Sequence, residues 1–385
     1  MRWLALGARS GLIGAGHALT GVAALALGVT PALIPIPAAA TPPATSPAWV
    51  NITSSPYNAD PTDTSDATSG IAAAVSAALA GCYPLYLPQG KYKVSSTITI
   101  DTSGLSCPGG FTIISDGATL DGATVASGPV LAVQRSGGTT GAPAVDQNFS
   151  QAGSLAVLAS NAAYAVAIGK ADFSDKFQGL RIEHLAAANA SSAGGAGGIK
   201  VNYVVGARLW LGGAAAGGSA ATAAVAVEQA QDSQIAGAGA ASGASAASLL
   251  VENGVSTGNT FSGFNYGTTS NTCLSITAAG AALNAFVAPN FGCTIAVNAT
   301  ASGTGNVLVP PVFAGANRGP ISGGITIVGR GALSRYVAPA ASAYTALCSD
   351  DGTMFSSAAA TGSGAGTWAA SSLPVTLPNP ATCGA

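Results

Sequence analysis

The chain has 385 residues, only 7% of them charged, and a formal net charge of −2 at pH 7. Charged residues normally make up about a quarter of a globular protein, whereas Gly, Ala, Ser, Thr and Asn predominate here. A weakly acidic chain without a basic cluster argues against nucleic acid as a partner. The length permits more than one ordinary domain, but a solenoid can grow to this length without splitting.

Residues 1–40 have the features of a secretory signal. Arg2 and Arg9 precede a long apolar run, and Ala38-Ala39-Ala40 offers a small-residue cleavage site. The alternative is an uncleaved membrane anchor, but three prolines near the end of the apolar run disfavour a regular spanning helix. We therefore expect a signal peptide over 1–40, a linker over 41–56, and a secreted or cell-surface protein with no membrane association after cleavage. Loss of Arg2 and Arg9 leaves 11 basic and 15 acidic residues, a net charge of −4.

Residues 57–100 predict a short helix followed by two strands. Asp66 is placed to cap the helix, apolar residues recur at helical spacing, and Gly81 supplies a left-handed stop. Extended runs follow at residues 85–87 and 92–100, separated by a turn at residues 88–90. A short amphipathic helix ahead of many brief strands is typical of the capped end of a solenoid.

This segment resembles a known family. Its motifs are Asn58-Ala59-Asp60-Pro61-Thr62, then Asp66-x-Thr68-x-x-Ile71, then Tyr86-Leu87-Pro88-x-Gly90-x-Tyr92. They are similar to the opening of the pectate-lyase-like right-handed parallel β-helix family, which includes polysaccharide lyases, hydrolases and phage tailspikes. Asn58 and Asp63 stand where that family usually has glycine. The resemblance implies an all-β, single-stranded right-handed parallel β-helix over residues 57–335, with a short N-terminal capping α-helix and a C-terminal cap or tail over 336–385.

A short motif recurs from residue 180 onward, with one β-branched residue between polar or small neighbours. The central residues are 19, 26, 24, 25 and 21 positions apart, close to one coil of a parallel β-helix. We expect them to stack in one interior column: Ile182, Val201, Val227, Val251, Ile276 and Val297. A second column is predicted from Asn259, Asn284 and Asn306, whose amides would bond between coils. The alternative is chance recurrence in a chain rich in Ala, Gly and Ser.

Six cysteines in an exported chain favour disulfides over a zinc site, and no Cys-x-x-Cys is present. Many connectivities are open, but the spacings of 25 and 20 residues are each about one coil. Stacking therefore favours nearest-neighbour pairing: Cys82–Cys107, Cys273–Cys293 and Cys348–Cys383.

The same repeat predicts an outer surface, because successive residues of a strand point to opposite faces. With coils about 4.8 Å apart, Glu228 and Glu252 would be neighbours, and Glu183 would lie about 9.6 Å from Glu228 along the axis. Paired carboxylates are the catalytic groups of glycoside hydrolysis. The predicted catalytic residues are Glu228, Glu252 and Glu183, and the predicted substrate-binding residues are Arg181, Lys200, Tyr203 and Trp210. The alternative is a solvated polar column that flanks strands in any β-helix.

The catalytic sets of polygalacturonases, such as Gly-His-Gly and Arg-Ile-Lys, do not occur at usable positions, and no aspartate cluster typical of lyases is evident. Only the structural motif carries over. No metal or cofactor is expected, with calcium as the exception if the protein is a lyase.

Two functions remain open. The first is an exported carbohydrate-active protein that binds or cleaves an acidic polysaccharide along the helix face, as a polysaccharide lyase or glycoside hydrolase if it is an enzyme. The second is a non-enzymatic surface, adhesion or tailspike-like β-helix. The sequence does not decide between a monomer and a homo-oligomer.

Overall fold

The computed structural model describes residues 49–328, with gaps at 104, 106, 108–109, 136–148, 171–175, 216–222, 253–255, 267–269, 300–301, 310–311, 314–320 and 324. Beyond them it describes four strand fragments: β27 (Arg335–Val337), which pairs with β29 (Thr353–Phe355), and β28 (Tyr344–Thr345), which pairs with β30 (Val375–Thr376). The predicted signal peptide and the predicted Cys348–Cys383 disulfide lie outside the described residues.

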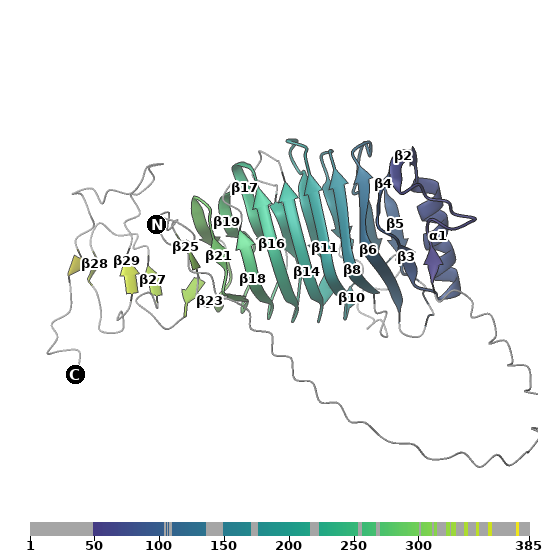
Figure 1. Ribbon diagram of the computed structural model, residues 1–385. Coiled ribbons are helices and arrows are strands. Elements are labelled where there is room, and N and C mark those ends of the chain that lie inside the picture. The colour runs from purple at the N-terminus through teal and green to yellow at the C-terminus, as the bar shows by residue number, and fades with distance from the viewer. Residues whose placement is uncertain are drawn as a thin grey trace, which may run out of the picture. The chain divides into compact units, whose positions relative to one another are not determined.

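Two long sheets contain most of the described chain (Figure 1). The first, sheet A, has the strand order β1 (Val50–Asn51), β3 (Leu85–Leu87), β6 (Phe111–Gly122), β8 (Phe149–Ala159), β11 (Arg181–Asn189), β14 (Arg208–Ala215), β16 (Gln234–Ala241), β18 (Thr260–Tyr266), β20 (Ala285–Val287), β23 (Asn306–Val309) and β26 (Ile325–Ile327). Four further strands pair beside this path: β2 (Thr62–Asp66), β4 (Gly90–Lys93), β21 (Asn290–Phe291) and β24 (Val312–Phe313).

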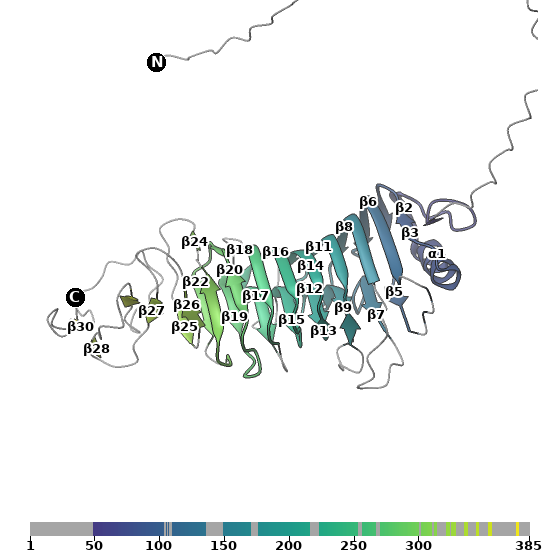
Figure 2. The ribbon, with the colours of Figure 1, turned by 90° about the horizontal axis from the view of Figure 1, so that it is seen from below.

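The second, sheet B, has the order β5 (Ile98–Asp101), β7 (Leu131–Gln134), β9 (Tyr164–Ile168), β12 (Gly197–Asn202), β15 (Ala223–Glu228), β17 (Gly243–Glu252), β19 (Ser270–Ile276), β22 (Ile295–Ala299) and β25 (Ile321–Gly323). In the view from below, its strands follow one another along the same stack (Figure 2). A third side is short and consists of β10 (Phe177–Gln178) with β13 (Val204–Val205), continued by single bridges through Gln231, Thr257 and Ala282.

The chain alternates between sheets A and B, and the strands of each sheet pair in parallel with the corresponding strands of the coils before and after. The protein is therefore an all-β parallel β-helix with an α-helix at the N-terminal end of the described stack, as the sequence predicted. Buried aliphatic and aromatic side chains fill the space inside the coils in one continuous core.

The predicted interior column is correct for four of its six members. Val201, Val227, Val251 and Ile276 are in-register partners on sheet B. The prediction is wrong for Ile182, which lies on sheet A and pairs with Leu209. It is also wrong for Val297, whose partner is Leu274, in the neighbouring column.

Both errors come from spacings that are shorter than one coil. In-register partners on sheet B, such as Val201 and Val227, are 24 to 26 residues apart over these strands. The 19 residues from Ile182 to Val201 do not complete a coil, because they lead from sheet A to sheet B. The 21 residues from Ile276 to Val297 are two fewer than the 23 that separate the in-register partners Leu274 and Val297.

The predicted asparagine column is confirmed. Asn259, Asn284 and Asn306 are fully buried, and each amide donates to or accepts from the next one along the stack at 2.9–3.0 Å. The same side chains accept backbone N–H groups of the preceding coil and donate to backbone carbonyls. Beside them the rings of Phe261 and Phe286 stack with centroids 4.9 Å apart. The turn into sheet A is therefore held by a buried amide ladder whose hydrogen bonds are satisfied between coils.

Helix α1 (Thr68–Gly81) covers the first coil and contacts β1, β3 and β5 (Figure 1). Asp66 lies one residue before the N-cap, Ala67, but its carboxylate still accepts the N–H of Thr68 at 3.0 Å. The predicted left-handed stop at Gly81 is wrong, since Cys82 has the positive φ of 54°. A Cβ at Gly81 would lie 2.5 Å from the ring of Tyr83, so a side chain there would displace this exposed ring.

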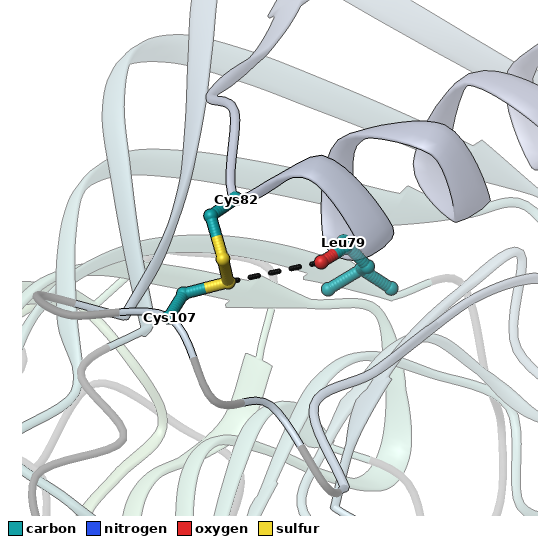
Figure 3. The surroundings of a disulfide bond; sticks show 3 residues. All are labelled: Leu79, Cys82 and Cys107. Atoms are coloured by element: carbon teal, nitrogen blue, oxygen red, sulfur yellow. Dashed lines mark hydrogen bonds between the residues drawn. A yellow bond between two sulfur atoms is a disulfide. The ribbon is translucent and has the colours of Figure 1, made fainter.

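Both disulfides that fall within the described residues are confirmed. Cys82–Cys107 joins the end of α1 to the segment before β6, and Cys273–Cys293 joins β19 to the segment before β22. The Cys107 sulfur also lies 3.7 Å from the Leu79 carbonyl oxygen (Figure 3). An oxidised sulfur has no proton to donate, so we regard this as a packing contact.

Candidate functional site

The structure divides the predicted site between two outer faces. Arg181 and Glu183 lie on β11 and Trp210 on β14, all in sheet A. Lys200, Glu228 and Glu252 lie on β12, β15 and β17 of sheet B. Tyr203 belongs to neither group: it occupies the turn between β12 and β13 with φ 42°, and the Lys176 ammonium lies 6.0 Å from its ring centroid.

The predicted spacing of Glu183 from Glu228 is wrong, because the two residues are on different sheets. Glu183 lies at a register shift in β11, where the strand bulges between Ile182 and Leu185. Its Oε2 accepts the backbone N–H of Gly153 at 2.9 Å. This carboxylate satisfies a backbone donor that the bulge leaves unpaired.

On sheet B, the predicted neighbours Glu228 and Glu252 are in-register partners. The Lys200 ammonium lies 2.7 Å from Glu228 Oε1 and 3.7 Å from Glu252 Oε1. Glu228 is only 2% exposed, and about a quarter of the Lys200 side chain reaches solvent. The Tyr164 ring covers the cation, with its centroid 5.5 Å from Nζ.

Small and apolar side chains enclose this cluster. Ala226 and Leu250, which follow Lys200 in register along sheet B, are both buried, and the Tyr164 ring packs against their cluster. Gly197 leaves the space that the Tyr164 ring fills, since a Cβ on Gly197 would lie 2.2 Å from that ring. We refer to Tyr164, Lys200, Glu228 and Glu252 as the sheet B cluster.

This enclosure changes the acidity of the cluster. Burial, and then the hydrogen bond to Glu228, raise the pKa of Glu252 to about 7, although the nearby Lys200 cation opposes the shift. Burial beside both carboxylates also raises the pKa of Tyr164. Near neutral pH, Glu252 is therefore substantially protonated and donates its proton to Glu228.

A hydrogen-bonded carboxyl pair is closer than the roughly 5–9.5 Å that separates the two carboxyl groups of glycoside hydrolases. No sugar fits between groups that already share a proton. Lys200 is likewise engaged with both acids rather than directed to an external anion.

On sheet A the charged side chains are exposed instead. Arg181 and Arg208 are in-register partners on β11 and β14, so they lie about one strand spacing, 4.8 Å, apart. Neither guanidinium forms an ion pair within the described part of the chain. Arg208 is not among the residues predicted from the sequence, because the repeat on which that prediction rests runs mostly along sheet B. The sequence signal for Arg208 is the Arg-aliphatic pattern shared by Arg181-Ile182 and Arg208-Leu209.

An aromatic group adjoins the arginines. Trp210 is 56% exposed and lies two residues along the strand from Arg208. The exposed His184 ring packs edge-on against it at 5.9 Å, and its Nδ1 hydrogen-bonds the Ser154 hydroxyl at 2.9 Å. We refer to Arg181, His184, Arg208 and Trp210 as the sheet A face.

Beyond Trp210 the outer surface of sheet A becomes nearly free of side chains. A shallow groove of about 370 Å³ crosses β8, β11, β14 and β16, and its floor consists mainly of Ala and Gly. The sheet A face thus borders an open surface on which an extended ligand meets no bulky obstacle.

Within the described residues, no three His, Cys, Asp or Glu side chains are grouped as metal ligands. In the same part of the chain, no helix has the length and apolar character needed to cross a bilayer.

Comparison with known proteins identifies no relative from the sequence. No protein-family model matches the chain, and no curated protein is detectably similar to it. Among solved structures, ORF18 of Geobacillus virus E2 is similar with a TM-score of 0.37 and 14% identity, over 74% of this chain and 62% of that one. The Dettilon tailspike protein gp208 is similar with a TM-score of 0.33 and 14% identity, over 86% of this chain and 69% of that one. The chain thus spans less than two thirds of the first neighbour's length.

Proposed function

We propose that the protein is an exported β-helix protein that binds an acidic polysaccharide on the sheet A face. The observation that carries this proposal is the pair of exposed arginines, Arg181 and Arg208, held side by side next to an exposed tryptophan.

Like charges directly opposite each other on neighbouring strands destabilise a sheet. Arg181 and Arg208 retain this arrangement without an acidic partner among the described residues. A carboxylate-bearing ligand would relieve the repulsion, and a planar guanidinium binds a carboxylate with two parallel hydrogen bonds. The proposed ligand is therefore anionic.

Trp210 supplies the second requirement of a sugar site, a flat apolar surface for a pyranose ring. Packing against His184 limits the number of positions its ring adopts, which reduces the entropy lost when a ligand binds. The adjoining groove in sheet A runs across the strands, so a chain of sugars can extend from Trp210 over several coils.

The two disulfides support an extracytoplasmic location, because such bonds persist in oxidising compartments. This agrees with the signal peptide expected over residues 1–40. The proposal also covers a non-enzymatic surface or tailspike-like protein, because such a protein needs only to bind the polysaccharide.

The test is titration of the purified chain with oligouronates and with neutral oligosaccharides of equal length. Arg181→Ala with Arg208→Ala should weaken oligouronate binding about 10–100-fold, since a hydrogen bond to a charged group is worth about 1.5–3 kcal/mol. Trp210→Ala should weaken it at least about tenfold, as truncation of a central aromatic anchor does.

Trp49→Ala is the matched control, because Trp49 is also exposed, at 43%, but packs on Tyr86 at the first coil. Equal affinity of the wild-type chain for charged and neutral oligosaccharides would contradict the proposal. Release of new reducing ends or of an unsaturated product during the titration would show that the protein also cleaves its ligand.

A further inference from the structure

The sheet B cluster has no part in the proposed polysaccharide site, yet it brings together an amine, a carboxyl group and a proton donor. Lys200 Nζ is 2.7 Å from Glu228 Oε1, so the Glu228 carboxyl carbon is within reach of the lysine nitrogen without any backbone movement. Protonated Glu252 hydrogen-bonds the same carboxyl group and lies 3.7 Å from the same nitrogen.

We propose that Lys200 and Glu228 condense to an isopeptide bond that links β12 covalently to β15, with Glu252 transferring the protons. Nothing in the proposed polysaccharide binding depends on this bond.

The reaction needs no oxidant or other reactant. Lys200 first returns one proton to Glu228, which converts the ion pair into a neutral amine and a neutral carboxylic acid. The nitrogen lone pair then attacks the carboxyl carbon, and the carbon–oxygen single bond breaks. Glu252 protonates the departing oxygen and takes a proton from the nitrogen, so it ends unchanged. The products are one amide and one water molecule.

The surroundings favour both the neutral reactants and the amide. An ion pair that is largely removed from water loses much of its hydration energy, and Glu228 is 2% exposed. Ala226, Leu250 and the Tyr164 ring form the apolar enclosure. An amide keeps one donor and one acceptor but no charge, and the released water leaves to solvent.

Register keeps the reacting groups in place. Lys200 pairs with Ala226, two residues before Glu228, and Asn202 is the in-register partner of Glu228 itself. The lysine side chain therefore extends along the sheet toward the carboxyl group of the next coil. Effective concentrations of groups held in this way are very high, which compensates for weak intrinsic reactivity.

The test is the mass of the intact, folded chain after reduction of its disulfides. The wild-type mass should be lower than the sequence mass by one water molecule, and Lys200→Arg and Glu228→Leu, neither of which can form the amide, should each restore the full mass for their sequence. Glu183→Gln, on sheet A, is the matched control and should retain the loss of water.

Trypsin gives a second readout. An amide on Lys200 blocks cleavage there, so the peptide 182–208 should remain joined to the peptide 209–318 after reduction. Glu252→Gln keeps a hydrogen-bonding side chain but cannot exchange the proton, and should give a folded, unlinked chain.

A folded wild-type chain at the full sequence mass after prolonged incubation at neutral pH would overturn the proposal. Loss of water that persists in Lys200→Arg would place the link elsewhere and overturn it equally. A linked Glu252→Gln chain would contradict the role assigned to Glu252.

Discussion

The outer faces of sheets A and B both carry charged side chains, but these side chains differ in their exposure to solvent and in their pairing. On sheet B, Lys200 and two glutamates are enclosed and satisfy one another. On sheet A, Arg181 and Arg208 are exposed and have no acidic partner in the described part of the chain. A charge whose partners are already provided by the fold has little to offer a ligand, whereas a charge left in solvent beside a like charge is available for one. On this basis we propose a structural role for the sheet B cluster and ligand binding for the sheet A face.

The largest expected effect is a difference in the free energy of unfolding between a substitution on sheet B and one on sheet A. Lys200→Ala leaves the Glu228 carboxylate buried and unpaired, whether the wild-type residues form an ion pair or the proposed amide, so the free energy of unfolding should fall by about 3–5 kcal/mol. Arg181→Ala, at an exposed position without a partner, should change it by no more than about 0.5 kcal/mol. Urea unfolding of both variants measures the contrast. Equal effects would remove the distinction between the faces.

The pH dependence of stability should come from sheet B. Glu252 has a pKa of about 7 when folded, against an ordinary value of 4.5, so the folded chain binds this proton more tightly than the unfolded chain. The contribution to stability is therefore present below about pH 4.5 and is lost as the pH rises through 7, by at most about 3 kcal/mol, because solvent screens part of the effect at this partly exposed carboxyl group.

Glu252→Gln tests this assignment, because it cannot titrate. Melting temperatures of the variant between pH 5 and 8 should be flatter than those of the wild type. Burial is the largest cause of the shift and persists if Lys200 and Glu228 are linked, so the sign is the same in both forms. A wild-type chain that becomes more stable from pH 5 to pH 8 would contradict the prediction.

The smallest effect on stability is expected on sheet A, with the opposite sign. Arg208→Glu replaces a like-charge pair by an ion pair with Arg181, and should raise the free energy of unfolding by about 0.5 kcal/mol. The same change should abolish oligouronate binding, because it places a carboxylate where the ligand carboxylate is expected. Arg208→Gln is the control that removes the charge without adding an acid, and should weaken binding less.

Most of the fold could be predicted from the sequence. The opening motif around Asp60 and Gly90 indicated the capped β-helix, and the spacing of Asn259, Asn284 and Asn306 predicted the amide ladder. These features repeat once per coil, so their periodicity is visible in one dimension. The two described disulfides followed for the same reason.

The division of the site could not be predicted as readily. Each coil has two long strands with the same alternation of buried and outward residues, so Arg181-Ile182-Glu183 looks like Ala226-Val227-Glu228. Only the short spacing from Ile182 to Val201, 19 residues against 24 to 26 later, indicates a change of sheet. The enclosure of Glu228 depends on neighbours from other coils, such as Tyr164, which no local pattern identifies.

Hydroxyl-radical footprinting of Trp210 and Trp49 is the sharpest test of ligand binding on sheet A, since both side chains are exposed in the same molecule. With a saturating oligouronate, Trp210 should be strongly protected from oxidation, whereas the oxidation of Trp49 should not change. Equal oxidation of Trp210 with and without bound oligouronate would contradict the assignment of binding to sheet A.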